Sequence, residues 1–148
     1  MKHLVFHDII NHVMRHIYLR SLQHKKMYTW LSVFFGILLF IVSLMPHEYI
    51  EKSWYPQISD LFDMMNHFIG FTIFNFLLFS TFLGKYDKSV YKKALVLYVM
   101  IGVSWGLLCE GIQLLNATRS FQIIDLFANT APVLIIFILF RKKRMDKL

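Results

Sequence analysis

The sequence predicts an all-α membrane protein with four transmembrane helices, preceded by an amphipathic helix at the membrane surface. Hydrophobic residues make up 57% of the 148 residues, and the mean hydropathy is +0.51. Soluble domains contain about 45–50% apolar residues. The apolar residues are also gathered in four long runs, between short segments that carry most of the charge. The length suits a single domain.

The four apolar runs have the length of membrane spans. A helix needs about 20 apolar residues to cross the bilayer core, within a range of about 17–25. The second run is at the short end of this range, so we expect its helix to begin nearer Asp63. The spans would build a transmembrane domain over residues 27–148. The expected spans are Met27–Met45, His67–Leu83, Ala94–Leu115 and Phe121–Phe140.

Residues 1–26 are predicted to form a basic amphipathic helix. Apolar residues recur at helical spacing, and Arg15 and Arg20 lie on the polar side, which is typical of helices in the headgroup region. The leading stretch is too polar for a cleavable signal peptide. Its histidines include i,i+4 pairs, but no Cys or acidic cluster supports a metal site, so we expect neither metal nor cofactor. These histidines are His3, His7, His12 and His16.

The basic residues predict the orientation in the membrane. Of the 16 lysines and arginines, all but Lys52 and Arg119 fall in the terminal segments or in the loop over residues 84–93. Four spans place those three segments on one side, which the positive-inside rule makes cytoplasmic. The net charge of +7 follows from this arrangement, and we expect no nucleic-acid partner.

Ionisable and amide side chains occur in or beside the last three spans. A charge at the bilayer centre costs about 2.5–3.5 kcal/mol on insertion scales, so each of these residues needs a reason. The topology places them at the outer end of the bundle at similar depth, and their spacing puts each set on one helix face. Gly70, Gly106 and Gly111 are expected to allow close helix approach there. The predicted site consists of Asp63, His67, Glu110, Gln113, Arg119, Asp125 and Asn129.

Two interpretations of this polar cluster stay open. In the structural one, a buried network locks the helices together, and Arg119 pairs with Glu110 or Asp125. In the functional one, the residues face the outer leaflet and receive a polar headgroup or a glycan-bearing molecule, because intramembrane ionisable residues commonly mark functional sites. The single cysteine, Cys109, lies in an apolar run and is expected to be a small packed residue.

The run from Glu110 to Asn129 resembles the signature of the VanZ-like family, in which E-x-x-Q is followed by R-x-x-x-x-x-D-x-x-x-N. The stretch from Asp63 to Gly70 is similar to that family's D-K-x-x-H-x-x-G motif, with Met64 in place of the lysine. A second departure is Thr130-Ala131-Pro132, where the family usually has glycines. The resemblance covers roughly residues 30–140 and leaves the acidic, amide, arginine and histidine positions intact.

The resemblance implies a multi-pass protein of the bacterial cytoplasmic membrane with a role in the cell envelope. The family's founding member is associated with resistance to teicoplanin, a lipoglycopeptide antibiotic. The expected partners are therefore membrane lipids and a lipid-linked cell-wall intermediate or a lipoglycopeptide. In this interpretation Arg119 meets an anionic group, Glu110 and Asp125 hold that arginine or accept protons, and the amides supply hydrogen bonds.

Two other functions compete with this non-enzymatic one. An intramembrane enzyme acting on a lipid carrier could draw acid and base groups from the polar cluster, but no nucleophile has a paired base at a fixed spacing. A transporter or channel subunit is disfavoured because the first span has no polar residue deep in the membrane. The sequence leaves the oligomeric state and the ligand open.

The orientation gives a direct prediction. Because the basic residues concentrate on one side, reporter fusions at Leu148 should report a cytoplasmic location, and fusions within residues 50–58 should report the opposite side. A non-cytoplasmic reading at Leu148 would contradict the four-span topology.

Overall fold

The computed structural model describes residues 12–13, 16–45, 59–85, 90–115 and 122–141, with the side chains of 59–62, 84–85 and 141 excepted. Within these ranges the chain is helical and has no strand. The principal helices are α2 (Lys25–Leu44), α4 (Ser59–Lys85), α5 (Tyr91–Gln113) and α6 (Ile123–Arg141). Residues 16–23, ahead of α2, are also helical, although their placement at a membrane surface stays a prediction.

All four helices are long and apolar enough to cross a membrane, which confirms the prediction of a multi-pass α-helical membrane protein. The candidate spans are Lys25–Leu44, Asp63–Leu83, Tyr91–Gln113 and Ile123–Phe140. The second span begins at Asp63, as its short apolar run suggested. It is also the least apolar and the most buried, with 56% of its residues inside the bundle against 17% for α2. Neighbouring helices therefore bury Asn75, Ser80 and Thr81 of α4.

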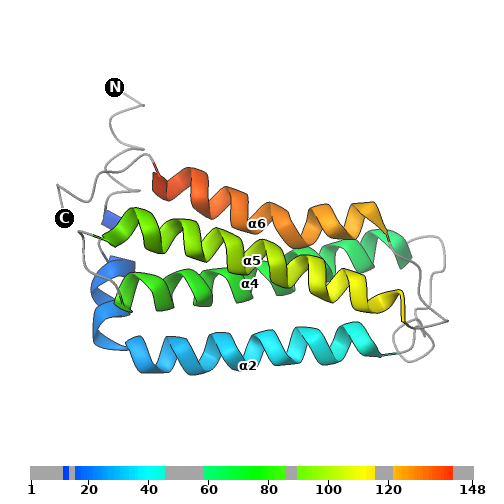
Figure 1. Cartoon of the computed structure of the whole chain (residues 1–148), viewed down its shortest axis with the longest axis horizontal. Helices are drawn as coiled ribbons and strands as arrows, with labels where there is room; N and C mark the ends of the chain where they lie inside the picture. Colours follow the sequence, from blue (N-terminus) through cyan, green and yellow to red (C-terminus); the bar gives the residue numbers. More distant parts are fainter. Residues whose placement is uncertain (1–11, 14–15, 46–58, 86–89, 116–121, 142–148) are drawn as a thin grey trace.

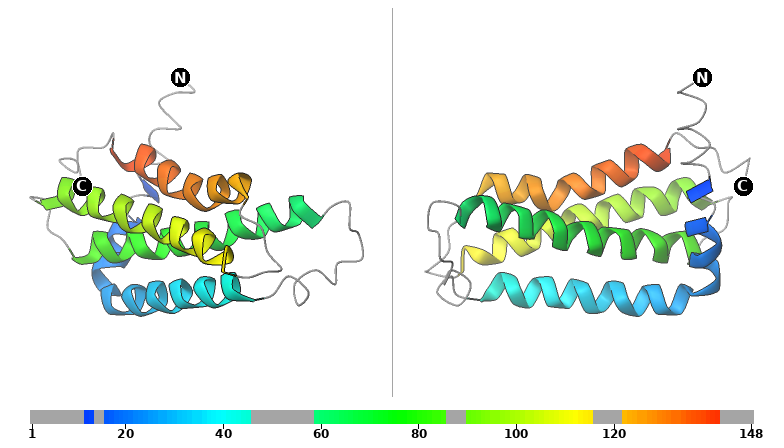
Figure 2. Two further views of the ribbon diagram at one scale, coloured as in Figure 1. Left: turned by 45° about the vertical axis from the view of Figure 1, so that its right-hand side comes forward. Right: turned by 180° about the vertical axis from the view of Figure 1, so that it is seen from behind.

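Helices α4 and α5 form the centre of the bundle. Each packs against the three other helices, so α2 and α6 lie on opposite edges (Figure 1). Views from other directions show the same order, with α2 below and α6 above the central pair (Figure 2). Both central helices therefore have protein neighbours on several sides.

Aromatic packing closes one end of the bundle. Phe79 of α4 lies with its ring centroid 4.1 Å from Phe140 of α6 and 5.3 Å from Tyr98 of α5. The hydroxyl of Tyr91 donates to the carbonyl of Phe140 at 3.3 Å. The start of α5 and the ends of α4 and α6 meet here, beside the start of α2 (Figure 1).

The same end carries the described lysines of the helix starts. Lys25 and Lys26 open α2, and Lys92 and Lys93 lie in the first turn of α5, all of them exposed. The orientation prediction requires basic residues to gather at one end of the bundle, and these four lysines do so. The opposite end receives the last turns of α2 and α5 and the first turns of α4 and α6, where the predicted polar cluster lies (Figure 1).

Glycines permit close contact at most of the helix crossings, but one expectation was wrong. A Cβ atom on Gly70 would lie 3.0 Å from Leu39, and one on Gly106 would lie 3.3 Å from the Cβ of Asn129. A Cβ on Gly111 would meet none of the described residues within 4 Å. Among those residues Gly111 therefore makes no close approach, although it lies only five positions after Gly106.

The tightest glycine contact was not predicted. A Cβ on Gly102 would lie 2.6 Å from Oδ1 of Asn75 and 2.9 Å from Val133. Neither neighbour can move easily. Asn75 is fully buried and its Nδ2 donates to the carbonyl of Phe71, and Val133 is a fully buried β-branched residue with a stiff rotamer.

Gly102→Ala should lower the stability of the protein, because the added methyl group overpacks the contact between α4, α5 and α6. The expected loss is about 1–3 kcal/mol. Gly111→Ala is the matched control, since it adds the same methyl group to the same helix where no described residue lies within 4 Å. It should leave stability unchanged or raise it by up to about 1 kcal/mol through helix propensity. Thermal unfolding of both variants in detergent measures this, and equal midpoints would contradict the contact.

Candidate functional site

The predicted polar residues of α4, α5 and α6 meet at the end of the bundle opposite the aromatic cluster. Arg119 lies outside the described residues. The structure brings the other six predicted residues together. Glu110, Gln113, Asp125 and Asn129 are buried, and Asp63 and His67 are partly buried.

Glu110 is the centre of the cluster. Its side chain is fully buried, and Oε1 accepts the backbone N–H of Gln122 at 3.0 Å. Gln122 immediately precedes α6, where the first backbone N–H groups of a helix have no partner within that helix. Glu110 of α5 therefore satisfies the N-terminus of α6, and its charge suits the positive end of that helix dipole.

The second carboxylate oxygen of Glu110 accepts two side-chain amides. Gln113 Nε2 donates to Oε2 at 3.5 Å from the next turn of α5, and Asn129 Nδ2 donates to it at 3.4 Å from α6. Both amide groups are themselves buried. A buried carboxylate is tolerated when such donors replace water, so the network compensates much of the cost of placing Glu110 in a membrane span.

The side-chain amide of Asn129 contacts both Glu110 and His67. Because the amide NH2 of Asn129 faces Glu110, its oxygen faces α4, where it lies 2.8 Å from His67 Nδ1. An amide oxygen can only accept, so His67 Nδ1 is the donor and carries the proton. In the neutral imidazole the lone pair is then on Nε2. The chain of contacts from Glu110 through Asn129 thus sets the tautomer of His67.

Two carboxylates lie near His67. Its Nε2 lies 3.8 Å from Oδ1 of Asp63, one helical turn earlier in α4. A potential ligand atom from each of Asp63, His67 and Asp125 lies within 4.8 Å of the others. Asp125 is in the first turn of α6, where its charge also suits the helix N-terminus. These three side chains form the only group of three or more potential metal ligands among the described residues.

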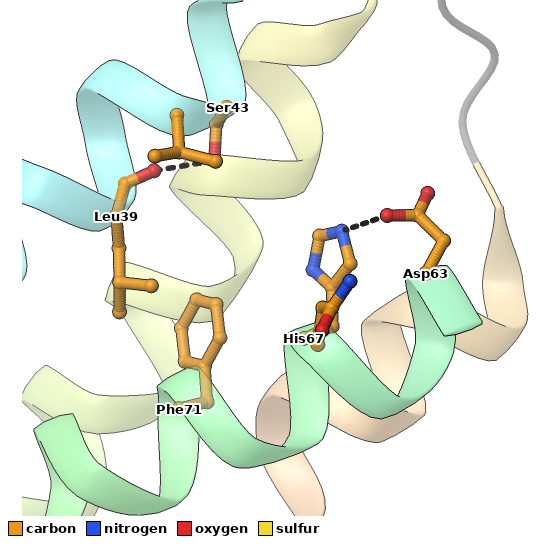
Figure 3. Close-up of a pocket in the computed structure, with 7 residues that line it drawn as sticks. Leu39, Ser43, Asp63, His67 and Phe71 are labelled. Atoms are coloured by element: carbon orange, nitrogen blue, oxygen red, sulfur yellow. Dashed lines mark hydrogen bonds and ion pairs between the residues drawn. The ribbon is translucent and has the colours of Figure 1, made fainter. Parts of the chain in front are cut away.

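A cavity of about 220 Å³ lies beside this group, between α2 and α4 (Figure 3). Asp63, Asn66 and His67 line its polar part. Its remaining wall is formed by Leu39, Val42, Ser43 and Phe71. Ser43 donates its hydroxyl to the carbonyl of Leu39, so it presents little polarity to the cavity. The lining therefore changes from polar at the end of the bundle to apolar deeper inside.

Sequence reasoning missed the contribution of α2. Ser43 and Val42 line the cavity, although the first span carries no acidic or basic residue between Lys26 and its end. A signal was present, because the buried residues of α2 are the small residues Ser32, Gly36 and Ser43. Small residues on one face of a membrane helix mark a packing surface.

Some polar residues take no part in the cluster. Asn75 lies two turns deeper in α4 than His67, about 12 Å along the axis, and bonds to its own helix. Cys109 is buried, as expected for a small packed residue. Asn66, by contrast, was not predicted and lines the cavity.

Comparison with known proteins gave no match to any family model, any curated protein or any solved structure. The resemblance to the VanZ-like family therefore stays a prediction from the motif residues.

The hydrogen-bond chain predicts the state of one histidine. ¹⁵N NMR of histidine-labelled protein should show the neutral form of His67 with its proton on Nδ1, because Asn129 offers it only an acceptor. His67→Gln identifies the resonance by its loss. Asn129→Ala removes the acceptor and should shift His67 toward the Nε2–H tautomer or an exchange average of the two. A predominant Nε2–H tautomer in the unchanged protein would contradict the chain.

Proposed function

We propose that this chain is a VanZ-like integral membrane protein of the bacterial cell envelope whose cavity binds one part of an amphipathic ligand. The observation that supports this most is the graded lining of the cavity. A polar group would lie against Asp63, Asn66 and His67, and a hydrocarbon segment would lie deeper, against the apolar wall. Lipids and lipid-bearing molecules have this polarity profile.

The size of the cavity limits how much of a ligand it can enclose. Pockets that enclose a drug-sized molecule measure about 300–1,000 Å³. At about 220 Å³, this cavity suits a headgroup portion with a short stretch of chain, while the rest of the molecule stays in the membrane or in water. With the proposed orientation the cavity opens toward the outer leaflet. A lipid-linked cell-wall intermediate and a lipoglycopeptide such as teicoplanin both fit this description.

The charges assign roles to the residues in this proposal. Asp63 accepts hydroxyl or amine protons from the polar part of the ligand, and Asn66 adds neutral hydrogen bonds. Glu110, Gln113 and Asn129 hold the first turns of α6 and His67 in position. Arg119, which lies outside the described residues, is proposed to meet a phosphate or carboxylate group through its planar guanidinium.

A second candidate function is an intramembrane enzyme that acts on a lipid carrier. One observation favours it: Asn129 accepts from Nδ1 of His67, and the ring's other nitrogen, Nε2, lies 3.8 Å from Asp63, which lines the cavity together with His67. A histidine in this state can act as a general base. The two functions differ in the fate of the ligand, which binding leaves unchanged and catalysis converts.

Filling the cavity should abolish ligand retention. Val42→Phe adds bulk to the cavity wall at the end of α2, and Val33→Phe is the matched control on the lipid-exposed surface of the same helix. Mass spectrometry of gently extracted protein should find a lipid with the unchanged protein and with Val33→Phe, and at least tenfold less with Val42→Phe.

In a susceptible Gram-positive host, the unchanged protein should lower sensitivity to teicoplanin more than to vancomycin, and Val42→Phe should lose this effect.

Two outcomes would contradict parts of the proposed function, and a third would favour the enzyme. Equal lipid retention by Val42→Phe and Val33→Phe would contradict the cavity as the binding site. Unchanged antibiotic sensitivity with well-expressed protein would contradict the proposed role toward lipoglycopeptides. A lipid recovered only in converted form, and unconverted with His67→Gln, would favour the enzyme.

A further inference from the structure

Asp63 and His67 lie one helical turn apart in α4 and near Asp125 of α6, without a direct hydrogen bond between the first two. Nε2 of His67 lies 3.8 Å from Oδ1 of Asp63. Hydrogen bonds between nitrogen and oxygen have lengths of about 2.7–3.2 Å. The gap is therefore too wide for a direct hydrogen bond between these two side chains.

The hydrogen bond of His67 makes this gap informative. Nδ1 of His67 donates to Asn129, so Nε2 is the ring nitrogen that could bind a metal ion. One potential ligand atom from each of Asp63, His67 and Asp125, which come from two helices, lies within 4.8 Å of the others. A cation between them would be attracted by both carboxylates.

We propose that Asp63, His67 and Asp125 form a binding site for a divalent metal ion of the zinc type. The ion would be held by Nε2 of His67 and by one carboxylate oxygen from each aspartate. Ligands at about 2.0–2.2 Å from a tetrahedral Zn²⁺ lie about 3.3–3.6 Å apart. The 3.8 Å separation of Asp63 and His67 is close to this value, and no separation in the group exceeds it by more than about 1.2–1.5 Å.

The surrounding residues match a metal site in two further respects. A metal-bound histidine characteristically donates its other N–H to an acceptor that fixes the ring, and Asn129, itself held by Glu110, supplies that acceptor. Asp63 and His67 also line the cavity, so an ion bound by three protein atoms would leave its fourth position toward that space. Three protein ligands with one open position are typical of zinc sites that bind a further ligand.

The choice of ion follows from the ligand set. One imidazole with two carboxylates suits Zn²⁺ or Mn²⁺, whereas Ca²⁺ and Mg²⁺ prefer oxygen ligands alone. The two aspartates also compensate the charge of a divalent ion at a depth where water is scarce.

The test measures the metal alone, without lipid or antibiotic, so it is independent of the proposed function. The full chain, carrying an affinity tag without histidine, is extracted in detergent, treated with a chelator and titrated with Zn²⁺ against a chromophoric competitor. We expect one Zn²⁺ per chain, at least tenfold weaker binding in Asp63→Asn and in His67→Gln, and about 10–100-fold weaker binding in Asn129→Ala. Co²⁺ in place of Zn²⁺ should give the strong visible absorption of a four-coordinate site.

Two controls keep the result decisive. The variant with His3, His7, His12 and His16 all changed to Gln tests adventitious binding by the N-terminal histidines, and it should keep the affinity of the unchanged protein. Zn²⁺ should also raise the thermal unfolding midpoint of the unchanged protein but not that of Asp63→Asn, whose partly exposed side chain makes it the variant best suited to fold. The proposal is overturned if the unchanged protein binds no Zn²⁺ or Mn²⁺. It is equally overturned if Asp63→Asn and His67→Gln bind as the unchanged protein does, or if only the N-terminal variant loses the ion.

Discussion

The polar end of the bundle depends on one buried carboxylate. Glu110 is fully buried in a candidate membrane span, where an ionisable group without donors would be costly. It receives donors from its own helix, from the backbone at the start of α6 and from Asn129. Because Asn129 in turn orients His67, one interaction joins α5, α6 and α4. The position and tautomer of His67 follow from it.

Close helix contact makes this interaction possible. At Gly106 the backbone of α5 approaches α6 so nearly that a Cβ would lie 3.3 Å from the Cβ of Asn129. Without that approach the short asparagine side chain could not reach both Glu110 and His67. Four positions earlier, Gly102 lets Val133 and Asn75 close on α5. Small residues and polar residues therefore act together, as is usual in membrane bundles where lipid is as apolar as the core.

The two ends of the bundle are built from different interactions. At one end Phe79, Tyr98 and Phe140 pack as an apolar cluster without a described cavity of comparable size. At the other end, hydrogen bonds hold α4, α5 and α6 together, and α2 contributes mainly small residues and apolar side chains. The cavity lies where this less buried helix meets the polar face of α4. Its graded lining is a consequence of that meeting.

The sequence by itself determined the helical class, the number of spans and the depth at which polar residues lie. These properties are local, because the bilayer sets the length of each span and the turns set its ends. The choice of partners was decided only by the tertiary structure: Glu110 with the start of α6, Gly102 rather than Gly111 at the close contact, and Ser43 and Val42 at the cavity. Each depends on how the helices rotate about their axes and which neighbours they take. Packing between residues far apart in the chain decides this, and helical spacing alone does not specify it.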